Sequence, residues 1–385
     1  MENKKTYWAY SLMYIIVFFI PYAVIPYAFV HDEFPIYVEL MFKITLISTI
    51  FYLFALNTSF GLKSKNVKII LNFEKFIYLL FSFFILIVLI ILITAPNIPI
   101  IQSLKGASQK DLSISREDFL KAREGWQASL GYVIGIINAY FLPYFITLAF
   151  SRNHRHKFIF AGIFLLYCLS FLEKAYFLKL AIPLFFLYLY EAKNKFIFML
   201  KGVSVILLAI FLMYFLSGET GSDVDSEQGL FSILHTPDGT FQAIIWRSTI
   251  VPIVTALDGV RVFVTEFNGQ FFHGNTSSLI AFITGGERVN FERILYQTQF
   301  GGSETGNSNQ FFLIEAYINF GIVGVCIFSF TVGKFIRGFI LSNDIALLSV
   351  APLFVFHLFN AGLVGILFSN GFLLFYFFIV FVKLK

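Results

Sequence analysis

The longest polar stretch of this chain, from Gly218 to Gln310, contains arginine but no lysine. Its guanidinium groups belong to Arg247, Arg261, Arg288 and Arg293. A guanidinium presents a planar fork of donors that grips a phosphate through two hydrogen bonds and stays charged at any working pH. If two or three of these groups converge, they form a site suited to a diphosphate.

Two further arginines, Arg116 and Arg123, lie just before the apolar segment 128–150. Their spacing of seven predicts that both lie on one face of a helix. The alternative for Arg116, Arg123, Arg288 and Arg293 is a solvated ion pair, because each has a glutamate beside or near it. Arg247 differs, because its surroundings are apolar and contain no neighbouring acid.

Ionisable residues inside apolar segments are costly in a membrane and are either paired or functional. Glu39 and Lys43 are four residues apart, so they can neutralise each other on one helix. Glu315 has no basic residue within a turn and is a candidate for proton exchange with a substrate. Lys174 or Lys179 could reach a lipid-linked phosphate, or could extend its ammonium group to water.

The sequence gives no sign of a metal or cofactor site. Its histidines are scattered, and no cluster of histidine and cysteine has zinc spacing. No nucleotide-binding loop or hydrolase motif is visible. We therefore expect no metal, no cofactor and no nucleic-acid partner.

The composition places these residues in a membrane protein. The hydrophobic fraction is 58%, the charged fraction is 13%, and the mean hydropathy is +0.79, whereas a soluble domain has about a quarter charged residues. Apolar windows of roughly 17 to 25 residues mark membrane-spanning helices. About ten such helices are predicted, near 8–30, 36–58, 76–96, 128–150, 158–172, 175–190, 202–217, 311–332, 345–360 and 363–382.

Lysine and arginine in the short loops predict the orientation, because cytoplasmic loops retain positive charge. This rule places both termini in the cytoplasm and leaves two outer loops, 97–127 and 218–310. No repeat or linker is visible, so residues 1–385 are expected to form a single transmembrane domain. The aromatic stretch 231–272 predicts amphipathic helices that lie on the membrane over a cavity or cap the bundle.

In the run Gly306-Asn-Ser-Asn-Gln-Phe-Phe-Leu-Ile-Glu-Ala-Tyr-Ile-Asn-Phe-Gly-Ile-Val-Gly324, a polar patch leads into a Glu-Ala-Tyr and Asn-Phe-Gly pattern. This run resembles the segment that enters a late helix in the Wzy-type O-antigen polymerases. Trp246-Arg247 and Phe271-Phe-His-Gly-Asn-Thr276 are similar to their large periplasmic loop. The stretches 116–126 and 171–175 are similar to earlier segments.

The resemblance implies an all-α, GT-C-like polytopic membrane glycosyltransferase with a large periplasmic loop. It would join undecaprenyl-diphosphate-linked repeat units into surface polysaccharide at the periplasmic face of the bacterial inner membrane. Arg247 would hold the diphosphate, and Glu315 would be the base or a structural anchor near it. Further substrate-binding candidates are Arg116, Arg123, Lys174, Arg261, Arg288, His273, Asn309 and Tyr317.

The implied partners are lipid-linked repeat units, the lipid bilayer and a chain-length regulator protein. Three alternatives remain open, a flippase or transporter of lipid-linked oligosaccharide, an O-antigen ligase, and a purely structural membrane scaffold. A transporter would carry polar residues at several depths and symmetry between its halves. Ligases carry a His-Asn pair where this chain has Ser308-Asn309.

Overall fold

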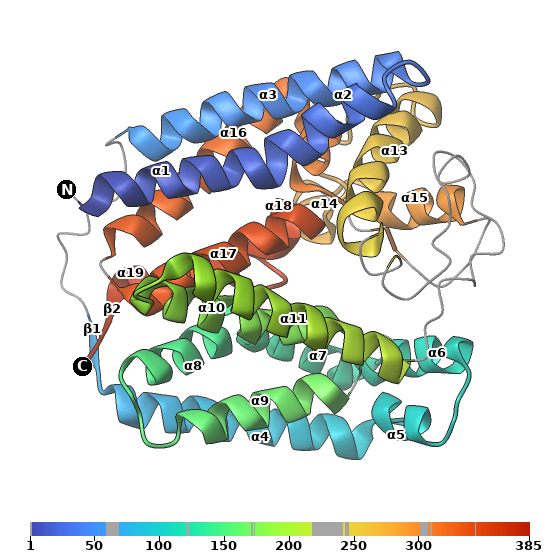
Figure 1. Cartoon of the computed structure of the whole chain (residues 1–385). Helices are drawn as coiled ribbons and strands as arrows, with labels where there is room; N and C mark the ends of the chain where they lie inside the picture. Colours follow the sequence, from blue (N-terminus) through green and yellow to red (C-terminus); the bar gives the residue numbers. More distant parts are fainter. Residues whose placement is uncertain are drawn as a thin grey trace. The chain divides into compact units, whose positions relative to one another are not determined.

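The computed structural model describes residues 2–58, 69–120, 123–170, 172, 174–217, 242, 246–300, 307–308, 310–342 and 344–385. These residues are mostly helical (Figure 1). The chain separates into two compact units. Unit 1 contains Met1–Gly61, Thr220–Asn343 and Phe354–Ile366, and unit 2 contains Leu62–Glu219, Asp344–Leu353 and Leu367–Lys385.

Unit 1 begins with a continuous helical rod in which a π-helical stretch interrupts the α-helix. The rod consists of α1 (Glu2–Tyr14), η1 (Ile15–Val24) and α2 (Ile25–Phe29). The remaining elements are α3 (Pro35–Asn57), η5 (Trp246–Ile250), α13 (Val251–Thr265), α14 (Ser278–Thr284), α15 (Phe291–Gln299) and α16 (Phe312–Leu341), together with the second part of α17 (Ile345–Asn360) and most of α18 (Leu363–Leu367).

Small and hydroxylated residues bring α3 and α16 together. A Cβ atom on Gly333 would lie 2.7 Å from the backbone oxygen of Tyr52, so the two backbones approach closely. The hydroxyl groups of Ser48 and Ser329 are 2.7 Å apart, and Tyr14 from α1 bonds to Ser48 at 2.5 Å. Membrane helices associate through such small residues and interhelical hydrogen bonds, because lipid supplies little hydrophobic driving force between helices.

Unit 2 is a second group of helices. Its elements are β1 (Ile69–Leu71), α4 (Phe73–Thr94), α5 (Pro99–Leu104), α6 (Gln109–Leu120), η2 (Gly125–Gln127), α7 (Ala128–Ile136), η3 (Ile137–Phe141), α8 (Leu142–Ser151), α9 (Lys157–Ser170), α10 (Lys174–Glu191), α11 (Lys195–Ser217), the first part of α17, α19 (Phe372–Phe381) and β2 (Val382–Leu384). The element η3 is a π-helical stretch inside the helix that runs from Gly125 to Ser151.

The strands β1 and β2 form a parallel pair that the sequence analysis did not predict. Ile69 pairs with Val382 and Leu71 with Leu384, and the pairing continues when Phe73 donates its N–H to Lys385 at 2.8 Å. This pairing fixes the end of the chain to the start of α4.

In each unit, basic side chains near the end of one helix bond to the end of another segment. In unit 2, Arg152 donates a hydrogen bond to the backbone oxygen of Leu384 at 3.0 Å, beside the strand pair. In unit 1, Lys334 and Arg337 near the end of α16 donate to Thr58 and Leu56 at the end of α3.

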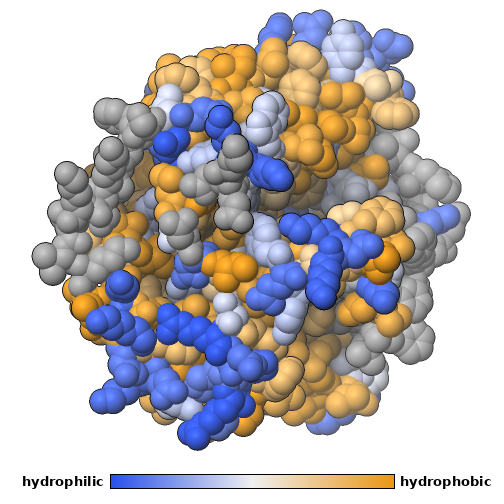
Figure 2. Space-filling view, turned by 60° about the vertical axis from the view of Figure 1, so that its left-hand side comes forward, coloured by the Kyte–Doolittle hydropathy of each residue, from blue (hydrophilic) through white to orange (hydrophobic). Residues whose placement is uncertain are grey.

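Six helices among the described residues are long and apolar enough to cross a membrane. Five of them match predicted spans: Lys4–Phe29, Pro35–Asn57, Phe73–Thr94, Gly125–Ser151 and Phe312–Leu341. Shorter apolar helices stand at Lys157–Ser170, Ile345–Asn360 and Phe372–Phe381. The chain is thus mostly helical, with several helices suited to a bilayer. In the face shown in Figure 2, apolar side chains cover much of the surface and hydrophilic ones gather in patches.

Two further differences from the sequence analysis concern helices. The sixth long apolar helix, Ser248–Thr265, lies in the region that we expected to form an outer loop. The predicted span 363–382 is divided into α18 and α19, because Gly371 adopts a left-handed conformation between them. The predicted pair of Glu39 and Lys43 is confirmed, with 3.5 Å between the charged atoms.

Candidate functional site

Asn319 of α16 makes three hydrogen bonds to the segment Phe271–Thr276 in unit 1. Asn319 accepts the N–H of Gly274 on its side-chain oxygen at 2.9 Å, and its amide nitrogen donates to the hydroxyl of Thr276 at 2.8 Å. Its backbone oxygen accepts the N–H of His273 at 3.0 Å. Two stretches that the sequence analysis selected separately are therefore in direct contact.

A break in α16 makes these contacts possible. Gly321 has φ 62° and ψ −152°, a conformation that only glycine adopts readily. Because the helix is broken there, the backbone oxygens of Ile318 and Asn319 are available to the loop, and Ile318 accepts the N–H of Phe272 at 3.0 Å. The ring of Phe271 lies 3.1 Å from the position that a Cβ on Gly321 would occupy.

Glu315 lies one turn before Asn319 and is only 7% exposed. Its carboxylate accepts the N–H of Val364 at 3.1 Å, at the start of α18. A Cβ on Gly362 would lie 2.7 Å from this carboxylate, so a glycine is required beside it. Backbone N–H groups at a helix start favour a negative charge. Glu315 therefore connects α16 to the turn that begins α18.

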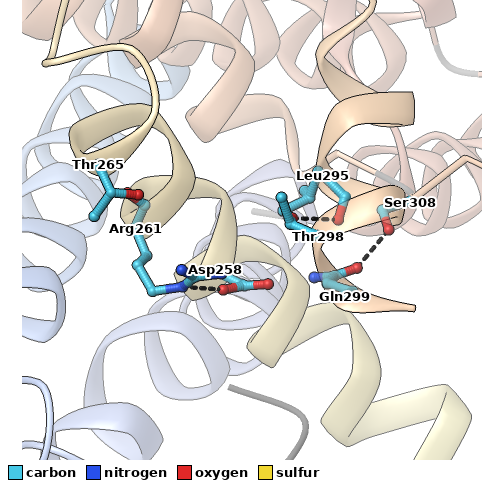
Figure 3. Close-up of polar contacts among 7 residues, drawn as sticks. All are labelled: Asp258, Arg261, Thr265, Leu295, Thr298, Gln299 and Ser308. Atoms are coloured by element: carbon cyan, nitrogen blue, oxygen red, sulfur yellow. Dashed lines mark hydrogen bonds and ion pairs between the residues drawn. The ribbon is translucent and has the colours of Figure 1, made fainter. Parts of the chain in front are cut away.

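A second polar group lies between α13 and α15 (Figure 3). Arg261 is paired with Asp258, three residues earlier on α13, through a hydrogen bond of 2.5 Å from Nε to Oδ1. Ser308 donates its hydroxyl to the side-chain oxygen of Gln299 on α15 at 2.5 Å. Its backbone N–H also donates to the backbone oxygen of Glu292 at 3.0 Å. The residues before α16 are thereby attached to α15.

Two of the loop arginines lie near the start of α15. Arg288 and Arg293 are both exposed. Burial raises the pKa of Glu292, and the positive charge of Arg288 opposes that shift. Glu292 is also close enough to Glu315 for the two carboxylates to interact electrostatically. This end of unit 1 thus brings acidic and basic side chains together.

The aromatic residues of the loop pack inside unit 1. The ring of Phe263 on α13 lies 5.8 Å from that of Phe271 and 6.0 Å from that of Tyr317 on α16. Phe267 contacts Phe272 with 4.9 Å between ring centroids. Tyr317, a predicted substrate-binding residue, is thus a partly buried neighbour of the loop. His273 is exposed and has a positive φ of 53°.

Arg123 in unit 2 is buried and holds the end of α4. Its guanidinium group donates to the backbone oxygens of Phe119 and Ile91 at 2.7 and 2.9 Å, and to the hydroxyl of Thr94 at 2.6 Å. Burial lowers the pKa of Arg123. The prediction that Arg116 and Arg123 share one helix face is wrong, because α6 ends at Leu120.

Three predicted residues are described only in part or not at all. The backbone of Arg247 lies in η5, and that of Lys174 begins α10, but their side chains are outside the described part of the chain, as is all of Asn309. Unit 1 contains Arg247, Arg261, His273, Arg288, Glu315 and Tyr317, whereas Arg116, Arg123 and Lys174 belong to unit 2.

Sequence reasoning did not select Asp258, Gln299, Gln310 or the contacts of Asn319. The spacing of three residues between Asp258 and Arg261 could have predicted their ion pair, because it places both side chains on one helix face. Within the described residues, no group of three or more histidine, cysteine, aspartate or glutamate side chains could hold a metal ion.

Comparison with known proteins finds no match for this chain. No protein family, curated protein or solved structure is detectably similar to it. The residues and their geometry are therefore the basis for a functional proposal.

Proposed function

We propose that this chain is a membrane glycosyltransferase that polymerises lipid-linked oligosaccharide repeat units, as its resemblance to the Wzy-type O-antigen polymerases implies. The donor is a glycan on undecaprenyl diphosphate, and the acceptor is a sugar hydroxyl at the non-reducing end of a second lipid-linked unit. The bond from the donor's anomeric carbon to the diphosphate oxygen breaks, and a bond from that carbon to the acceptor oxygen forms. The acceptor hydroxyl gives its proton to a base or to the departing diphosphate oxygen, and undecaprenyl diphosphate leaves.

The observation that carries the proposal is the concentration of buried polar side chains at one end of α16. Glu315, Asn319 and Gln310 are all nearly fully buried there, and Asp258 is buried on the neighbouring α13. The opposite end of α16 contacts the end of α3 through Lys334. Buried ionisable groups in membrane helices are costly and mark functional sites by default.

The departing diphosphate builds up negative charge, which fixed guanidinium groups stabilise more in the transition state than in the ground state. We propose Arg247 for this role. Its backbone lies in η5, and π-helical turns are frequent at functional sites. Arg261 lies farther along the same continuous helix, and Arg288 is exposed in the segment between α14 and α15.

The contacts of Glu315 favour the anchoring role over the role of a base. Its carboxylate is buried and accepts a backbone N–H, so it positions α18 against α16. Substitution by glutamine tests both roles, because glutamine keeps the side-chain oxygen but cannot accept a proton from the acceptor hydroxyl at neutral pH. Suppressed turnover in a folded Glu315→Gln variant would support a base.

The experiment uses the purified full chain in liposomes with lipid-linked repeat units and no nucleotide sugar. We expect a ladder of longer glycans. Arg247→Ala should abolish the ladder while the protein still folds, and Arg293→Ala is the matched control that should leave it intact. Equal effects of the two substitutions would contradict the role of Arg247.

The same experiment separates the alternatives. A flippase or transporter would move the lipid-linked unit across the liposome membrane without lengthening it. An O-antigen ligase would transfer the glycan only when its lipopolysaccharide acceptor is present. The proposed enzyme acts on the periplasmic side of the bacterial inner membrane, needs no cofactor, and could work with a chain-length regulator.

A further inference from the structure

Three nearly fully buried side chains in unit 1 each keep one polar atom without a hydrogen bond to any described residue. These atoms are Oδ2 of Asp258, Nε2 of Gln299 and Nε2 of Gln310. The three side chains are 0%, 0% and 3% exposed. Buried polar atoms in proteins are almost always hydrogen-bonded, so three exceptions in one region call for a physical explanation.

Two of the three side chains, Asp258 and Gln299, come from helices that contact each other. A Cβ on Gly259 of α13 would lie 3.6 Å from Leu295 of α15, so the two helices pack closely beside Asp258. Figure 3 shows the amide end of Gln299 pointing toward Asp258. Gln310 is two residues beyond Ser308, which bonds to Gln299.

The charges in this region favour a neutral ligand. Arg261 donates to Oδ1 of Asp258, which balances the charge of the carboxylate and leaves Oδ2 as an acceptor. The two amide nitrogens are donors. A group that both donates and accepts hydrogen bonds can satisfy all three atoms, and a hydroxyl is such a group.

We propose that Asp258, Gln299 and Gln310 form a hydroxyl-binding site that takes a sugar hydroxyl of the glycan substrate. The hydroxyl donates its proton to Oδ2 of Asp258 and accepts from the amide nitrogens. The identity of the ligand as a glycan rests on the proposed function, whereas the donor and acceptor pattern does not.

The test measures binding without requiring transfer. The repeat-unit oligosaccharide is released from its lipid by mild acid and titrated into the full-length protein in detergent. We expect Asp258→Asn and Gln310→Met to raise the dissociation constant by about tenfold or more, as expected when a partner of a ligand hydroxyl is lost. Gln270→Met is the control, because Gln270 is exposed in the same unit. Unchanged affinity in folded Asp258→Asn and Gln310→Met proteins would overturn the proposal.

The structure of the protein with the oligosaccharide gives the same answer without any substitution. A sugar oxygen within hydrogen-bond distance of Oδ2 of Asp258 supports the site, and a water molecule alone at that position overturns it. Oligosaccharide binding at this site without a glycan ladder from the wild type would refute the proposed polymerase and leave the binding site standing. A ladder from the wild type, together with unchanged oligosaccharide binding in both variants, would support the polymerase and refute the binding site.

Discussion

The hydrogen bonds of Asn319 allow a quantitative prediction. Its side chain makes three bonds of 2.8 to 2.9 Å, to Gly274, Thr276 and the backbone of Glu315, and it is only 2% exposed. A net contribution of about 1 kcal/mol for each bond gives about 3 kcal/mol in total. Asn319→Leu has a similar volume and none of these bonds, so we expect it to lower the free energy of unfolding by about that amount.

Two of these bonds hold the segment Phe271–Thr276 on α16, so the variant should also open this segment more often. A loss of about 2 kcal/mol corresponds to a roughly thirtyfold larger open fraction. Chymotrypsin cleaves after phenylalanine, and its rate at Phe271 and Phe272 tracks the open fraction when reclosing is fast. We therefore expect roughly thirtyfold faster cleavage there.

Asn57→Leu provides the matched control. Asn57 is exposed and donates one bond to the backbone four residues earlier, at 2.8 Å. Its replacement should cost about 0.5 kcal/mol and leave cleavage at the loop unchanged. The reasoning is refuted if Asn319→Leu unfolds at the same denaturant concentration as Asn57→Leu and is cleaved at the same rate.

Three further outcomes follow from single side chains. Gly321→Ala should destabilise the protein by about 1 to 3 kcal/mol, because Gly321 has a positive φ. Gly365→Ala is the control and should not, because a Cβ on Gly365 would meet no atom within 4 Å. Thermal unfolding of the two variants compares these effects. Arg123→Met should lower the unfolding free energy by about 2 to 3 kcal/mol through its lost bonds, whereas exposed Arg155→Met should change it little. Burial raises the pKa of Glu292 in the folded protein. The free energy of unfolding should therefore fall as the pH rises from the pKa of Glu292 in the unfolded chain through its pKa in the folded protein. Glu292→Gln should flatten this pH dependence in unfolding midpoints measured across pH, and an unchanged slope would contradict this assignment.

The sequence predicted the long apolar helices well because length and hydropathy are local properties. It placed the helix Ser248–Thr265 in an outer loop, because Asp258 and Arg261 lower its hydropathy. These two charges neutralise each other on one helix face, which reduces the cost of burying them. The strand pair was missed because each strand is three residues long and its partner lies at the other end of the chain.

The candidate site was predicted as a set of segments, but the contacts between them were not. Phe271–Thr276 and the run around Asn319 were both selected, yet 45 residues separate Gly274 from Asn319. The role of Arg123 could not be inferred, because it depends on where α4 ends relative to the chain that follows α6. Such long-range contacts arise from tertiary packing rather than from local pattern.

The most direct test of the central claim is the release of free undecaprenyl diphosphate by the purified protein in liposomes. The reaction predicts one molecule of undecaprenyl diphosphate for each new glycosidic bond, without nucleotide sugar and with loss of release in Arg247→Ala. Lipid-linked units that remain intact, or a diphosphate release that does not match the number of bonds formed, would contradict the account.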